Sequence, residues 1–150
     1  MATSPHEMMG VTRLLEYCEG RENFADLQEE LRRTAAGLTY YGTYHYCLVV
    51  AQSLHYTIPR NRRGHATVSV HKALWDWFDN REDIEGDSDD SAALIAQLAR
   101  ELKGKRADAD YNYDESFSDT VSSLIEAQEQ IINMVMAWAK GLPDSLRNPP

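Results

Sequence analysis

Three arginines and a histidine lie close together in IPRNRRGH, residues 58–65. An arginine guanidinium group binds a phosphate through two hydrogen bonds, and a helix that starts nearby adds backbone N–H groups and a favourable dipole. We expect a helix to start near Ala66. The stretch therefore predicts an anion-binding or RNA-binding loop formed by Arg60, Arg62, Arg63 and Gly64. A solvated basic loop is the simpler alternative.

A second stretch, KRADADYNYDES, combines charge and tyrosine at residues 105–116. Arg106 can reach a carboxylate or the carbonyls that end a preceding helix, and Asp110 can accept backbone N–H groups at a turn. Tyr111 and Tyr113 can offer their rings to the core and their hydroxyls to its edge. The stretch therefore predicts a turn that fixes the angle between two helices, and a ligand-facing or RNA-facing role stays open.

The remaining histidines and acids do not suggest a metal site. His65 and His71 are six residues apart, whereas two zinc ligands on one helix face are four apart. The acidic run at residues 79–90 lacks the spacing of a calcium-binding loop. His71 falls on the apolar stripe of its predicted helix, which favours a hydrogen-bonded core or interface histidine. We expect no metal and no cofactor.

Helices must position these residues, because apolar side chains recur every three or four positions along most of the chain. Five predicted helices cover about residues 7–18, 23–58, 66–78, 91–105 and 116–138, the last one beginning at Ser116 or Ser118. The inward face of the first is expected to consist of Met8, Val11, Leu14 and Leu15. Strand patterns are weak. The sequence thus predicts an all-α bundle of about five helices.

The composition predicts one domain over residues 1–150, with its core at about 24–138 and a frayed tail at 142–150. No apolar run is long enough to span a bilayer and no signal peptide is evident, so we expect a cytoplasmic protein. Cys18 and Cys47 are expected to be buried thiols. Residues 1–75 are nearly neutral and residues 76–150 are strongly acidic, within a net charge of −9. This charge disfavours broad, nonspecific nucleic-acid binding but allows a local basic site.

The pattern R-x-x-A-D-Y, formed by Arg106, Ala109, Asp110 and Tyr111 and followed by Tyr113, resembles a signature of one branch of the HEPN family. Residues 43–55 resemble the end of that family's long helix, and Gly64-His65 resembles the start of the next. The resemblance covers residues 24–138. It implies an up-and-down helical bundle, a homodimer, and a partner of the nucleotidyltransferase type or a bound RNA or nucleotide. It also implies a role in a prokaryotic toxin–antitoxin or defence system.

Active HEPN nucleases are metal-independent endoribonucleases that use an Arg-x(4–6)-His motif. A histidine can take the proton of a ribose hydroxyl, and an arginine can stabilise charge on the phosphate. Here Arg106 is followed at those positions by Tyr111 and Asn112, and residues 76–150 contain no histidine. The resemblance therefore implies a noncatalytic binding or regulatory protein. Two alternatives stay open: an endoribonuclease that uses Arg60-x4-His65, and an acidic protein-interaction module.

Overall fold

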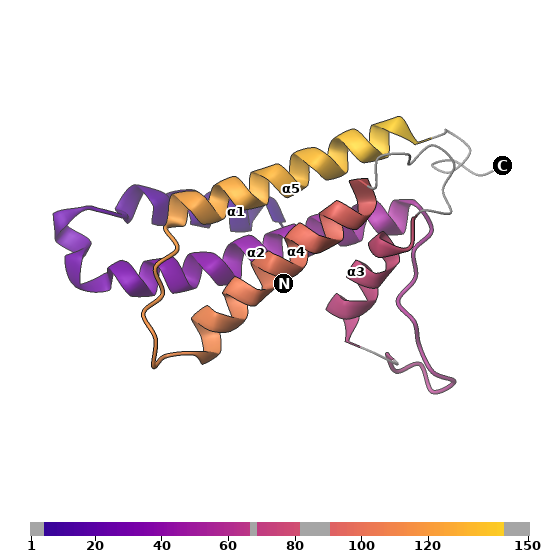
Figure 1. Ribbon diagram of the computed structural model, residues 1–150, viewed down its shortest axis with the longest axis horizontal. Coiled ribbons are helices and arrows are strands. Elements are labelled where there is room, and N and C mark those ends of the chain that lie inside the picture. Colours follow the sequence, from indigo (N-terminus) through magenta and orange to yellow (C-terminus); the bar gives the residue numbers. More distant parts are fainter. Residues whose placement is uncertain (1–4, 67–68, 82–90, 143–150) are drawn as a thin grey trace.

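The computed structural model describes residues 5–66, 69–81 and 91–142, and these residues form a bundle of helices (Figure 1). The elements are α1 (Pro5–Cys18), the short 3-10 helix η1 (Glu22–Leu27), α2 (Gln28–Ser53), α3 (Val70–Asp79), α4 (Ser91–Tyr111) and α5 (Val121–Gly141). The predicted all-α class is confirmed. No described helix is long and apolar enough to cross a membrane. Most of the acidic run 79–90 and of the tail 142–150 lies outside the described residues.

The long helix α2 is the centre of the molecule, because α1, α4 and α5 all pack against it. Small side chains allow α2 and α4 to approach closely, and Ala35, Ala36, Ala96 and Ala99 are fully buried. Short α3 packs mainly on α4 and contributes the buried rings of Trp75 and Phe78. Burial of each large aromatic or aliphatic side chain contributes roughly 1.5–3 kcal/mol to folding.

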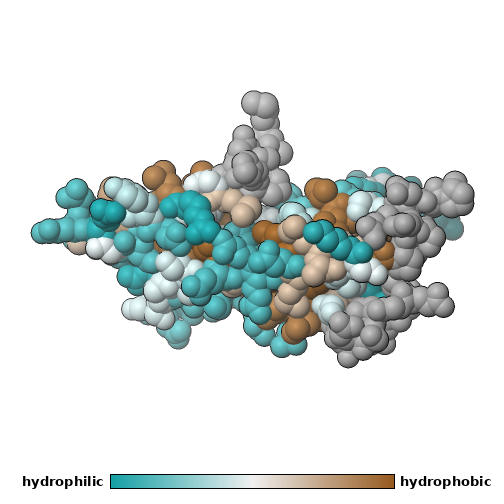
Figure 2. Space-filling model, turned by 90° about the horizontal axis from the view of Figure 1, so that it is seen from above, coloured by the Kyte–Doolittle hydropathy of each residue, from teal (hydrophilic) through white to brown (hydrophobic). Residues whose placement is uncertain are grey.

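The inward face of α1 is the predicted one only in part. Leu15 packs against the core, but Val11 and Leu14 are exposed and Thr12 is fully buried. Polar contacts help hold α1 in this orientation: Arg13 bonds to Glu129 of α5, and the Glu19 carboxylate accepts the Val121 N–H at 2.8 Å. Figure 2 shows separate apolar patches among hydrophilic residues on the face that it presents.

Two helix ends near the basic stretch differ from the prediction. The helix α2 ends at Ser53, because His55 adopts a positive φ of 70° and the Tyr56 N–H turns back to the Ala51 carbonyl. The helix α3 begins at Val70 rather than near Ala66, because Ala66 pairs with Arg60 in an isolated antiparallel bridge.

The helix α4 is longer than predicted and continues through the signature stretch to Tyr111. The helix α5 starts correspondingly later, at Val121. Its N-cap is Thr120, whose hydroxyl accepts the Ser123 N–H at 3.1 Å. The predicted turn at 105–116 is therefore wrong for its first half.

One arginine of α2 caps the end of α4. The carbonyls of the last helical turn have no partner inside a helix and must be satisfied by other groups. The Arg33 guanidinium donates hydrogen bonds of 2.8–3.3 Å to the carbonyls of Asp108, Ala109, Asn112 and Glu115. The Glu29 carboxylate accepts hydrogen bonds from Arg33 at 2.7 Å and from the Phe117 N–H at 3.2 Å. Arg33 and Glu29 thus fasten the α4–α5 connection to α2.

We predict that Arg33→Lys lowers the free energy of unfolding by about 2 kcal/mol, because an ammonium group cannot reach carbonyls that a planar guanidinium reaches together. Urea unfolding followed by circular dichroism measures this change. The matched control is Arg13→Lys on α1, whose exposed ion pairs are worth less than about 1 kcal/mol. Equal losses in the two variants would contradict the capping role of Arg33.

Candidate functional site

The basic stretch forms a closed hairpin at residues 60–66. The Asn61 N–H bonds to the His65 carbonyl at 2.7 Å, and the Gly64 N–H returns to the Asn61 carbonyl at 2.9 Å. Gly64 has a φ of 80°, a conformation that side chains disfavour. The Asn61 side-chain oxygen accepts the N–H groups of Arg63 and His65 at 2.9 and 3.0 Å. The tip of the hairpin is therefore fixed by its own hydrogen bonds.

This closure changes how the hairpin can bind an anion. The N–H groups of Arg63, Gly64 and His65 are all used inside the turn, and α3 starts only at Val70. The predicted contribution of a helix N-terminus directly after residue 65 is therefore wrong. Side chains remain as the groups that could bind a phosphate.

The side chains of the hairpin differ in their availability. The Arg60 guanidinium donates to the Gly64 carbonyl at 2.8 Å. Arg62, Arg63 and His65 are exposed, and their side chains form no hydrogen bond or ion pair within the described residues. Arg60 is thus bound within the turn, whereas the guanidinium groups of Arg62 and Arg63 at its tip have no bonded partner among the described residues.

The signature residues 106–111 lie on the last turns of α4, and Arg106 is the first of them. The Arg106 Nε is 2.8 Å from the Asp110 carboxylate, and Nη2 donates to the Tyr41 hydroxyl at 2.7 Å. The predicted contact of Arg106 with a carboxylate is confirmed. Asp110, by contrast, pairs with Arg106 and does not cap the turn into α5.

The other signature residues divide between core and surface. Ala109 is buried. Tyr111 and Tyr113 are each 74% exposed, so their predicted packing into the core is wrong. Instead, the guanidinium of Arg33 lies 4.9 Å from the Tyr113 ring centre, and that of Arg106 lies 5.6 Å from the Tyr111 ring centre. Both tyrosines therefore shield structural arginines.

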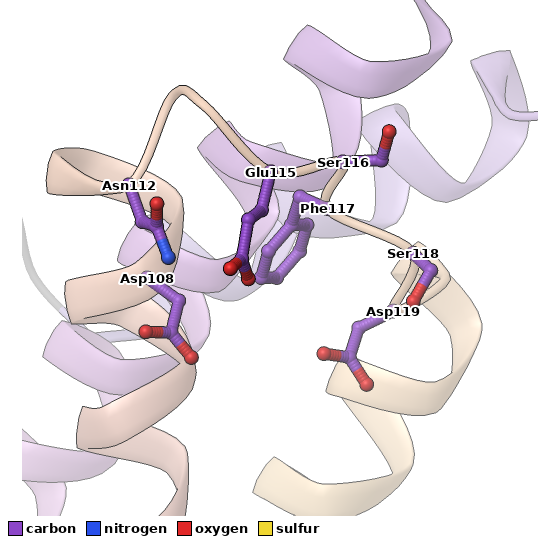
Figure 3. Close-up of a pocket in the computed structure, with 7 residues that line it drawn as sticks. All are labelled: Asp108, Asn112, Glu115, Ser116, Phe117, Ser118 and Asp119. Carbon is purple, nitrogen blue, oxygen red and sulfur yellow. The ribbon is translucent and has the colours of Figure 1, made fainter.

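A pocket of about 160 Å³ lies beside the signature stretch, between the end of α4 and the start of α5 (Figure 3). The carboxylates of Asp108, Glu115 and Asp119 point toward it, and the Ser116 hydroxyl points away. No group of three or more potential metal ligands in the described part of the chain is placed to hold a metal ion. Because this pocket is acidic, it repels phosphate. If the protein were an acidic interaction module, this pocket could bind a basic partner.

A hydrogen-bonded aromatic cluster surrounds His71 at the first turn of α3. The Tyr40 hydroxyl is 2.8 Å from His71 Nδ1, and it also accepts the Trp75 indole N–H at 3.3 Å. An indole only donates, so the Tyr40 oxygen accepts from Trp75 and its own proton can be donated to Nδ1 of His71. The Tyr44 ring centre lies 4.0 Å from that of His71. The predicted hydrogen-bonded histidine is confirmed.

The surroundings of His71 keep its ring neutral. Burial is the main cause that lowers the pKa of His71 to about 4, and electrostatic interactions with Lys103, Arg106 and His45 contribute to this value. Burial also raises the pKa of Tyr40 to about 12. The sequence showed Tyr40, Tyr41 and Tyr44 only as aromatic residues on one helix. Their grouping around His71 depends on how α2, α3 and α4 pack together.

The two cysteines are free thiols. Cys47 is fully buried, as predicted, and burial raises the pKa of its thiol. Cys18 is only partly buried.

No family model, curated protein or solved structure matches the chain.

We predict that His71 makes the fold sensitive to acid. Because its pKa in the folded protein is about 4 and its ordinary value is 6.5, the unfolded chain takes up the proton first. Stability is fully present above pH 6.5 and falls as the pH drops toward 4. His71→Gln should flatten this decline in urea midpoints measured from pH 7.5 to 4. His65→Ala, which changes an exposed histidine, serves as the control and should keep the wild-type slope.

Proposed function

We propose that this chain is a noncatalytic HEPN-like protein that binds the phosphates of RNA or of a nucleotide, with the tip of the 60–66 hairpin as part of its binding surface. The observation that supports this most directly is the pair of exposed arginines, Arg62 and Arg63, on a turn held closed by Asn61. A turn that is already ordered loses little conformational entropy when it binds. The backbone of the turn therefore adds little to the entropy cost of binding, and only the two arginine side chains are ordered by the phosphate.

The charge distribution favours selective rather than general binding. The chain carries a net charge of −9, and the pocket beside the signature stretch is lined by three carboxylates. A phosphate backbone is repelled by most of such a surface and attracted only where cations gather. This arrangement suits the recognition of one segment or one end of an RNA.

The noncatalytic role is supported by the engagement of both candidate arginines. Arg106 is bound to Asp110 and Tyr41, and Arg60 is bound to the Gly64 carbonyl. Neither is poised to meet a developing phosphate charge without first losing these contacts. The homodimer, the nucleotidyltransferase-type partner and the place in a toxin–antitoxin or defence system are proposed from the family resemblance alone.

We predict that Arg62→Gln/Arg63→Gln weakens binding of a fluorescent single-stranded RNA about tenfold or more in anisotropy titrations. Since each lost phosphate contact on a single strand lowers the salt slope by about 0.7, the slope should fall by roughly 1.4. The control, Arg13→Gln/Arg21→Gln, removes the same amount of charge from Arg13 in α1 and from Arg21 just after this helix. Equal weakening by the two double variants, or no binding by the wild type, would refute the hairpin surface.

The same preparations test the enzymatic alternative. End-labelled RNA incubated with the wild type in EDTA should remain intact. Cleavage by the wild type that disappears in His65→Ala would replace the binding proposal with an endoribonuclease that uses Arg60 and His65.

A further inference from the structure

A second group of cationic and hydrogen-bonding side chains gathers where α2, α3 and α4 meet. Asp76 of α3 reaches Arg100 of α4 at 2.9 Å, and His71 lies five residues earlier on α3. The two helices run in roughly opposite directions (Figure 1), so the first turn of α3 lies beside later turns of α4. These turns carry Lys103 and Arg106, whose charges both act on His71. These two residues are three positions apart and share a face of the helix.

The arrangement on the α2 side completes this group. The Tyr41 hydroxyl accepts a hydrogen bond from Arg106, and its ring centre is 6.0 Å from that of His71. His45 follows with its ring centre 5.2 Å from that of Tyr44. His45, His71, Lys103 and the Arg106 side chain, which is 19% exposed, are partly buried but still open to solvent.

Charge is balanced at one end of the α3–α4 contact and not at the other. Arg100 meets the carboxylates of both Asp76 and Asp79. At the His71 end, Asp110 pairs with Arg106, whereas Lys103 has no ion pair within the described residues. The first turn of α3 adds the positive end of a helix dipole. In an acidic chain, this leaves a local excess of positive charge that an anion would neutralise.

The available donors suit a phosphate monoester. Lys103 supplies an ammonium group, and His71 supplies Nε2, because its Nδ1 is bound to Tyr40, while Arg106 adds a fixed positive charge beside them. The rings of Tyr41 and Tyr44 lie beside the His71 ring. A terminal phosphate carries close to two negative charges and can accept several such bonds at once, whereas an internal phosphodiester carries one.

We propose that Lys103 and His71 bind a terminal phosphate beside the fixed positive charge of Arg106, either of a free nucleotide or of the 5′ end of an RNA. This site is separate from the hairpin and does not depend on it. A phosphate bound there would stabilise the charged form of the His71 ring. It would also form an ion pair with Lys103.

The test is isothermal titration of the full chain with inorganic pyrophosphate, AMP, and matched ten-nucleotide RNAs that carry a 5′-phosphate or a 5′-hydroxyl. Lys103→Gln should weaken binding of pyrophosphate and AMP about tenfold. Lys105→Gln lies two residues away on α4, and its lysine pairs with Asp119 at 3.3 Å, so it should bind like the wild type. Proton NMR of His71 should show its pKa rising when AMP is bound.

The outcomes separate this site from the hairpin. Arg62→Gln/Arg63→Gln should retain binding of AMP, and a preference for the 5′-phosphorylated RNA over AMP would identify an RNA end as the ligand. No saturable binding of pyrophosphate or AMP, or an equal loss in Lys103→Gln and Lys105→Gln, would overturn the proposed site. That result would leave RNA binding by the hairpin intact.

Discussion

The cap that Arg33 places on α4 is the interaction on which the rest of the structure depends. A single guanidinium on the central helix holds carbonyls from Asp108 to Glu115, while Glu29 holds the next part of the connection. The position of α4 along α2 is thereby fixed. Because Arg106 and Lys103 are on the same helix, their positions opposite Tyr41 and His71 follow from this cap. Only 11% of the Arg33 side chain is exposed, so water competes weakly for these bonds.

The helix α4 separates two kinds of electrostatic surface. On one side, Arg106 and Lys103 face α2 and α3 together with His71. On the other, Asp108 contributes to the acidic pocket, and Lys105 pairs with Asp119 beside the start of α5. Residues two positions apart on a helix point in different directions, so a stretch of mixed charge becomes two surfaces of opposite sign. The charges of residues 105–111 are thus sorted onto two surfaces by the geometry of helix α4.

The sequence predicted the elements better than their contacts. Helical periodicity indicated five helices. Apolar spacing alone gave the approximate positions of α1, α2, α4 and α5. The start of α3 was missed because Asn61 closes the hairpin and Ala66 pairs with Arg60, and neither contact has a local pattern. The role of Arg33 was missed because its partners are 75–82 residues away. The orientation of α1 was missed because polar contacts with α2 and α5 compete with a weak apolar stripe. Local spacing cannot reveal such distant pairings.

The two proposed phosphate sites are close enough to act on one RNA. Ala66 at the base of the hairpin and Val70 at the start of α3 are four residues apart. A fully extended chain of that length spans about 14 Å at most, so the base of the hairpin lies within a few nucleotides of His71. A free nucleotide is too short to contact both places. If the 5′-phosphate of an RNA occupied the site at Lys103 and His71, the phosphates that follow it could reach Arg62 and Arg63. The fixed hairpin would then set the direction in which the strand leaves, and the acidic pocket on the opposite side of α4 would disfavour the reverse path.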